Sequence, residues 1–97
     1  MASVYILYSG SIDRYYVGFT TESVEQRLQK HNDKYYDDKW TSKGRPWELF
    51  LEIRCNTDDE ARKVEKHIKK MKSKTYLLNL RKYPEMVDRL RQKAQDC

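Results

Sequence analysis

Five side chains spread over the first two thirds of the chain belong to types that act on anionic substrates. Tyr5 and Tyr16 supply two phenols near the start of the chain. Arg27 and His31 follow, four residues apart, and Glu65 comes later. A guanidinium is a planar, permanently charged fork for phosphate oxygens, and a carboxylate is a ligand that a hard divalent cation prefers. If the fold brings these groups together, they suit chemistry at a phosphate.

Each of these residues also has a purely structural explanation. Tyrosine is favoured in strands, where it packs half-buried against its neighbours. An arginine and a histidine four residues apart on a helix usually form a solvated face. Glu65 stands four residues before Lys69, so a surface ion pair of little energetic weight also accounts for it. The functional interpretation therefore depends on all five residues occurring in the right order on the right elements.

The hydrophobic pattern predicts a β-hairpin, a helix and a third strand in the first half of the chain. The β-prone runs 4–8 and 15–19 are joined by the turn residues of 9–14. A helix then begins at an N-cap, Thr21 or Ser23, and ends near His31 and Asn32. The third strand is expected to have one mostly buried face, formed by the alternating residues Trp47, Leu49, Leu51 and Ile53.

The second half of the chain predicts two more helices. The first begins at the capping box of Thr57 and Glu60. Its apolar stripe is Ala61, Val64, Ile68 and Met71, and its other side carries Lys63, Lys66, Lys69 and Lys70. After a short segment around 76–80, Pro84 opens the last helix. The expected order is β-β-α-β-α-α: an α+β fold with a small three-stranded antiparallel or mixed sheet flanked by helices, in one domain spanning 1–97.

The order of these residues resembles the GIY-YIG nucleases. The stretch Val4-Tyr5-Ile6 contains the tyrosine of the first triplet of that name, Ser3-Val4-Tyr5 here, and Tyr16-Val17-Gly18 corresponds to the second; Arg27-x-x-x-His31 and the helical Glu65 follow as in the family. Serine replaces the glycine of the first triplet, valine replaces the isoleucine of the second, and both phenols are kept. The resemblance spans nearly the whole chain and is greatest to the small, single-domain bacterial branch.

The resemblance implies an endonuclease that hydrolyses phosphodiester bonds of DNA, with RNA as the alternative substrate, by a mechanism that uses one divalent metal. Glu65 matches the metal-binding glutamate, which would hold Mg²⁺ or Mn²⁺. Tyr5 matches the general base, Arg27 would stabilise the transition state, and Tyr16 and His31 would hold water or phosphate. The remaining matches are structural positions of the site, Gly18 and Asn79.

The assignment of the base to Tyr5 rather than Tyr16 stays open at this point. A free phenol has a pKa of about 10, so a phenolate at neutral pH needs a nearby positive charge or metal to lower it. Arg27, His31 and the metal are the candidates for that charge. The other two tyrosines of the hairpin, Tyr8 and Tyr15, are expected to pack or to line the surface.

The charge of the chain favours a polyanionic partner. Lysine and arginine outnumber the acidic residues 20 to 15, which gives a formal net charge of +5 and a pI near 9.2. A basic surface is also a common solubilising feature, so the charge favours nucleic acid only modestly. The candidate phosphate-binding residues are Lys66, Lys70, Lys43 and Arg45.

The hydrophobic segments and the cysteines indicate where the protein is expected to reside and which cofactors it is expected to lack. No run of residues reaches membrane-spanning length or reads as a signal peptide, so a cytoplasmic protein without membrane contact is expected. Cys55 and Cys97 do not have metal-ligand spacing and are expected as reduced thiols. No small-molecule cofactor is expected.

Two alternatives belong to other functional classes. One is a nucleic-acid-binding module that keeps the nuclease fold but has little or no turnover. The other is a protein-interaction domain that would use the irregular loop 33–46 as its contact surface. Metal-dependent cleavage of nucleic acid distinguishes the nuclease from both.

Overall fold

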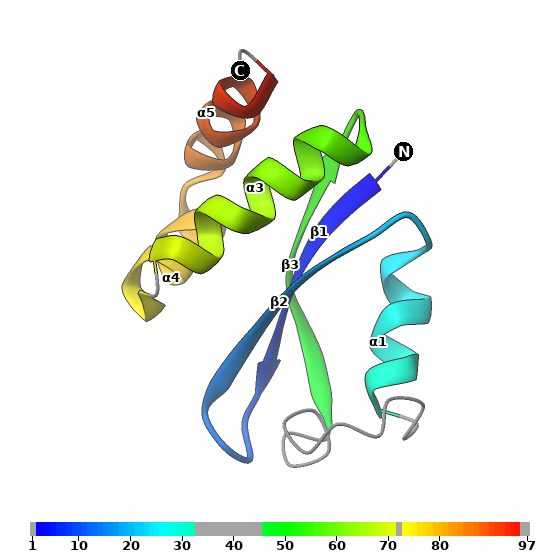
Figure 1. The fold of residues 1–97 in the computed structure, drawn as a ribbon. Helices are drawn as coiled ribbons and strands as arrows, with labels where there is room; N and C mark the ends of the chain where they lie inside the picture. Colours follow the sequence, from blue (N-terminus) through cyan, green and yellow to red (C-terminus); the bar gives the residue numbers. More distant parts are fainter. Residues whose placement is uncertain (1, 33–45, 72, 96–97) are drawn as a thin grey trace.

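The computed structural model describes residues 2–32, 46–71 and 73–95, except for the side chains of Lys30 and His31. A three-stranded antiparallel sheet has the order β2-β1-β3 and carries helices on both faces (Figure 1). The strands are β1 (Ala2–Ser9), β2 (Arg14–Thr20) and β3 (Trp47–Cys55), and the helices are α1 (Val24–Asn32), α3 (Asp58–Met71), α4 (Lys74–Lys82) and α5 (Pro84–Gln95). The predicted α+β class is confirmed.

The central strand β1 is buried on both faces. On one face, Val4 and Ile6 pack with Ile53 beneath α3, α4 and α5. On the other face, Tyr5 and Leu7 pack against the start of α1. This double burial explains why the strand is a continuous apolar run instead of an alternation of apolar and polar residues.

A bulge in β3 overturns the single buried face predicted for this strand. The partner in β3 changes from Leu51 to Leu49 between two neighbouring residues of β1, so Phe50 is an extra residue in the ladder. Because one extra residue reverses the alternation, Trp47 packs on the α1 face, whereas Ile53 packs beneath α3. The third strand therefore contributes to both cores.

The segment around 76–80, for which the sequence predicts no element, is the helix α4. The Ser73 hydroxyl caps it by accepting a hydrogen bond from the Tyr76 N–H at 3.1 Å, and Leu77 and Leu80 are buried. The described order is therefore β-β-α-β-α-α-α. Met71, expected in the apolar stripe of the preceding helix, is 44% exposed, because it is the last residue of α3.

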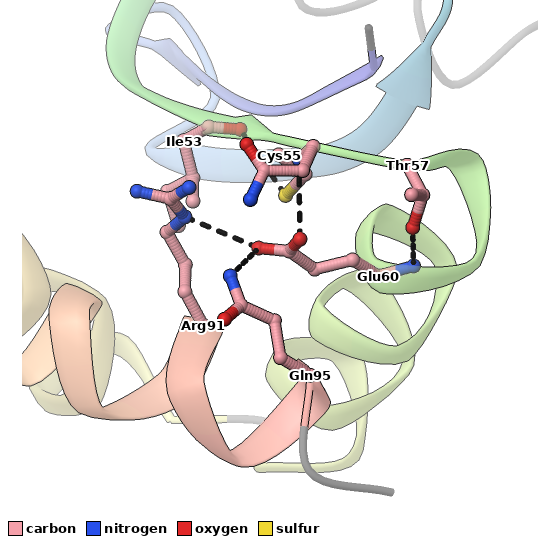
Figure 2. A network of polar contacts seen from close by, with 7 residues as sticks. Ile53, Cys55, Thr57, Glu60, Arg91 and Gln95 are labelled. Carbon is pink, nitrogen blue, oxygen red and sulfur yellow. Dashed lines mark hydrogen bonds and ion pairs between the residues drawn. The ribbon is translucent and has the colours of Figure 1, made fainter.

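The buried carboxylate of Glu60 joins α3, the residue that follows β3, and α5 (Figure 2). The Thr57 hydroxyl accepts from the Glu60 N–H at 3.1 Å, as the predicted capping box requires. The Glu60 side chain accepts from the Asn56 N–H at 3.1 Å, and its other oxygen accepts from Arg91 and Gln95, both at 3.2 Å. Glu60 is only 3% exposed, so α5 is fixed to the rest of the fold by a satisfied buried charge.

Replacing Arg91 with methionine tests this anchor. The substitution leaves the Glu60 carboxylate buried without its cation, so we expect the free energy of unfolding to fall by about 2–4 kcal/mol. The matched control is Lys63→Met, which removes the cation of the exposed Lys63–Asp59 pair of α3 and should cost less than about 0.5 kcal/mol. Urea-induced unfolding measures both values. Equal, small losses would show that the pair does not hold α5.

Candidate active site

The pleat of the hairpin separates its four tyrosines into two pairs on opposite faces of the sheet. Tyr5 lies opposite Gly18, and Tyr16 lies opposite Leu7, so both phenols are on the face covered by α1. Tyr8 and Tyr15 are paired on the other face, with ring centroids 4.9 Å apart. The expectation that these last two pack or line the surface is confirmed.

Tyr8 is held away from proton-transfer chemistry by the turn of the hairpin. Its hydroxyl donates to the Asp13 carboxylate at 2.8 Å, and this hydrogen bond raises the pKa of Tyr8. Asp13, at φ 50°, also accepts from the ammonium of Lys74 at 3.0 Å, and the Lys74 hydrogen bond followed by that of Tyr8 lowers the pKa of Asp13. The turn thus fixes Tyr8 as a hydrogen-bond donor.

The Tyr5 ring lies across β2 at the place where Gly18 leaves room for it. A Cβ atom at position 18 would lie 2.5 Å from the Tyr5 hydroxyl oxygen and 2.6 Å from Cζ. Gly18 has no positive φ, so the glycine is needed for this close approach and not for its backbone conformation. Tyr5 is fully buried, which fixes the direction of its phenol.

Tyr16 and Trp47 continue the aromatic row from Tyr5. The Tyr16 ring is 6.3 Å from the Tyr5 ring at an interplanar angle of 27°, and 6.3 Å from the Trp47 ring in an edge-on arrangement. Tyr16 is half-buried, whereas Tyr5 and Trp47 are buried. The row therefore places one enclosed phenol beside one that contacts solvent.

Helix α1 brings Arg27 to the same face of the sheet. The Ser23 hydroxyl accepts from the Gln26 N–H at 3.3 Å, which confirms Ser23 as the N-cap. Val24 and Leu28 pack with Tyr5 and its neighbours on this face. Arg27 follows Val24 by three residues and is therefore its neighbour on the helix surface, half-buried and with its Nε atom enclosed. The guanidinium is therefore held against the layer that contains the two phenols.

The other end of α1 is fixed by a contact for which the sequence analysis gave no prediction. The Asn32 amide accepts from the Trp47 N–H at 2.6 Å and donates to the Trp47 carbonyl at 3.0 Å. This pair of bonds joins the last residue of the helix to the first residue of β3. An asparagine at a helix end is the sequence signal that was available. The backbone of His31 lies in α1, and its side chain lies outside the described residues.

Glu65 comes from α3, on the opposite face of the sheet. It follows Arg62 by three residues, and the Arg62 guanidinium lies 5.7 Å from the centroid of the Phe19 ring on β2. Glu65 is therefore on the flank of α3 that faces the edge strand β2. Its carboxylate is 21% exposed and forms an ion pair with Lys69 at 3.6 Å, as its structural explanation predicts. The structure brings Tyr5, Tyr16, Gly18 and Arg27 to one face and places Glu65 on another layer.

A family model for the GIY-YIG catalytic domain matches residues 1–79, which is most of the 97-residue chain. The chain belongs to the GIY-YIG family. Membership implies a nuclease fold and a nucleic-acid substrate. No curated protein and no solved structure matches the chain. The GIY-YIG match ends inside α4 and leaves α5 outside it.

The residues of the GIY-YIG domain fit a single-carboxylate metal site. Within residues 2–32, 46–71 and 73–95, no three or more histidine, cysteine, aspartate or glutamate side chains gather into a metal cluster. Mg²⁺ does not require one, since it keeps several waters and often takes only one or two carboxylates from the protein. Glu65 is half-buried, and its partner Lys69 is 56% exposed and 3.6 Å away, so a cation can replace the ammonium.

The remaining candidate residues of the GIY-YIG domain are only partly described. Asn79 lies in α4, where its carbonyl accepts from the Tyr83 N–H at 2.8 Å, and its matched site position stays a prediction. Lys66 and Lys70 are exposed on the outer side of α3. Lys43 and Arg45 lie outside the described residues.

Two further expectations concern thiols and membranes. Cys55 is buried, and burial followed by the nearby Glu60 charge raises the pKa of its thiol to about 11. The thiol is therefore protonated at neutral pH and is a poor nucleophile. In the part of the chain that the structure describes, no helix is long and apolar enough to cross a membrane.

Replacing Gly18 with alanine tests the packing of Tyr5. The new methyl group would collide with the phenol, so we expect a loss of about 1–3 kcal/mol in the free energy of unfolding. With Tyr5 as the predicted general base, displacement of its phenol by an ångström is expected to lower cleavage by about 10²-fold. The matched control is Gly10→Ala in the hairpin turn, where the nearest atom would be 4.0 Å away. Similar losses at both glycines, measured by thermal melting and cleavage, would contradict the assignment.

Proposed function

We propose that the chain is a metal-dependent endonuclease that hydrolyses phosphodiester bonds of DNA, with RNA as the alternative substrate. The observation that supports this most directly is the close approach of the Tyr5 phenol to Gly18, beside Tyr16 and on the face that carries Arg27. The Tyr5 hydroxyl oxygen is the atom that would lie nearest a Cβ at position 18. The fold thus reserves space for a phenolic oxygen in a buried and fixed position.

In the proposed mechanism, Tyr5 accepts a proton from the attacking water as the water oxygen bonds to phosphorus. Tyr16, half-buried beside it, orients the water or a phosphate oxygen through its hydroxyl group. Arg27 donates hydrogen bonds to the non-bridging oxygens, whose negative charge grows in the transition state. The same guanidinium charge favours the phenolate form of the base. His31 is assigned to water or phosphate binding from its family position.

The proposed metal ligand is Glu65. A divalent cation at this carboxylate would neutralise phosphate charge and assist the leaving oxygen. Mg²⁺ or Mn²⁺ suits an oxygen ligand of this kind. Since Glu65 faces the edge strand β2 and the Tyr5 ring leans across β2 from the other side, the substrate phosphate would lie at the β2 edge of the sheet.

Most of the binding affinity in this proposal comes from basic residues outside the reacting groups. Lys66 and Lys70 are exposed and project outward from α3. Lys43 and Arg45 are proposed as further phosphate contacts. Such contacts release counterions from the nucleic acid, so binding should weaken steeply as salt rises.

One observation favours a second candidate, a binding module without turnover. The Glu65 carboxylate is already engaged by Lys69, which is what a purely structural glutamate would show. This candidate predicts a salt-sensitive gel shift with no cleavage in any divalent ion. Branched, single-stranded and duplex substrates incubated in parallel with Mg²⁺, Mn²⁺ or a chelator distinguish the two candidates.

Glu65→Gln tests the metal ligand. It keeps the shape of the side chain and removes the charge that holds the cation, so metal-dependent cleavage should fall by at least about 10²-fold while the fold persists. The matched control is Asp59→Asn, which neutralises the acidic partner in the other i,i+4 ion pair of the same helix. It should cleave like the wild type. Full cleavage by Glu65→Gln would remove Glu65 from the mechanism.

Tyr5→Phe tests the general base. The substitution keeps nearly all of the apolar volume, so cleavage should fall by about 10²–10⁴-fold with DNA binding and melting temperature nearly unchanged. Tyr8→Phe is the matched control on the other face of the same strand, and its turnover should stay close to wild type. The cleavage rate of Tyr16→Phe should lie between those of the other two variants if Tyr16 only orients water or phosphate. Equal and small effects at Tyr5 and Tyr8 would refute the catalytic role of the hairpin.

A further inference from the structure

A groove separates α3 from α5 on the side of the sheet opposite the two catalytic tyrosines. One part has a volume of about 280 Å³, and its lining residues are Lys63, His67, Leu90, Lys93 and Ala94. The part next to it, about 230 Å³, is lined by His67, Tyr76, Met86, Arg89, Leu90 and Lys93. The groove has an apolar floor and basic rims contributed by both helices. The proposed catalytic mechanism uses none of these residues.

One wall of the groove is formed by a helix that lies outside the segment matched by the family model. Helix α5 lies beyond residues 1–79, the segment that the GIY-YIG catalytic domain matches. The helix is fixed in place because Leu90 and Ala94 join the core and Arg91 and Gln95 bind Glu60 (Figure 2). Lys93 lines the groove from another flank of the helix, two residues from Arg91 and from Gln95. The contacts of Arg91 and Gln95 with Glu60 therefore fix α5, and with it the backbone position of Lys93 at the groove.

The charged side chains that line the groove are all basic. Among the described residues, neither lining set contains a carboxylate, and Arg89 and Lys93 are exposed and form no ion pair. Lys63 pairs with Asp59 at 3.0 Å, at the end of the groove near the start of α3. The hollow beyond that end is lined by Asp59 and Glu60 as well as by neutral groups. An anion would therefore bind in the part nearer α4.

The groove adjoins the basic outer side of α3. Lys66 follows Lys63 by three residues, and Lys70 follows His67 by three, so each pair is adjacent on the helix surface. A continuous basic track thus runs from Lys66 and Lys70 over the ridge of α3 and into the groove. A chain of phosphates can follow such a track.

We propose that the groove between α3 and α5 binds the phosphodiester backbone of the nucleic acid, as a second contact separate from the Tyr5 face. The inference rests on the proposed function, because it takes the nucleic-acid substrate as the ligand. It assigns to α5 the role of extending the substrate-binding surface beyond the catalytic domain. Lys93 and Arg89 are the phosphate-binding residues on α5.

The test measures DNA binding by Lys93→Ala and Arg89→Ala, each combined with Glu65→Gln and with chelator present so that no substrate is cut. Fluorescence anisotropy of labelled duplex DNA is recorded at several salt concentrations. Each substitution should raise Kd by about 3–10-fold and reduce the slope of log K against log salt by up to about 0.9, the value for one phosphate contact. In the background with Glu65 intact, kcat at saturating substrate should stay at the wild-type value.

The matched control is Lys82→Gln, which removes one exposed cation of α4 that lines neither part of the groove. The Lys82 ammonium lies 5.4 Å from the centroid of the Tyr83 ring, and its loss should leave Kd and the salt slope unchanged. The groove proposal is overturned if both groove variants bind DNA as the wild type does, or if the control variant loses as much DNA affinity as they do. In either case, cleavage of DNA by the wild type would still support the proposed function. A wild-type protein that neither binds nor cuts any nucleic acid overturns both. Binding of an acidic polypeptide with no effect of the groove variants on DNA would assign the groove to a protein partner.

Discussion

The burial of β1 on both faces is the constraint on which the rest of the structure depends. A strand covered on both sides must place successive residues in two separate environments. Tyr5 and Leu7 belong to a small aromatic layer under α1, and Val4 and Ile6 belong to the larger core under the other helices. One strand thus carries the Tyr5 phenol on one face and contacts the larger core with the other.

Several features of the fold could be predicted from local patterns. The hairpin, the N-cap at Ser23 and the division of the tyrosines depend on neighbouring residues or on the two-residue repeat, both of which are visible in the sequence. The bulge at Phe50 could not be predicted, because β3 is apolar on both sides of it and its alternation looks unbroken. The contact of Glu60 with Arg91 spans 31 residues and has no local signal.

The candidate site likewise has parts that the sequence predicts from neighbouring residues and parts that depend on contacts between distant residues. Gly18 and Tyr5 are opposite each other because of the hairpin register, which the length of the turn determines. The family pattern indicates Glu65 from the sequence, and the position of Arg62 over Phe19 shows which flank of α3 it occupies. The site is thus divided between two layers, and the edge strand β2 is where they meet.

The Glu60 carboxylate has a consequence for how the catalytic domain can be excised. The family match ends at Asn79, but the cation and the amide that satisfy this carboxylate come from Arg91 and Gln95. Truncation at the family boundary would remove two of the donors to this carboxylate and keep the Asn56 N–H, and it would uncover the apolar residues that Leu90 and Ala94 cover. The minimal fragment expected to remain stable therefore extends through α5 and exceeds the segment that sequence comparison defines.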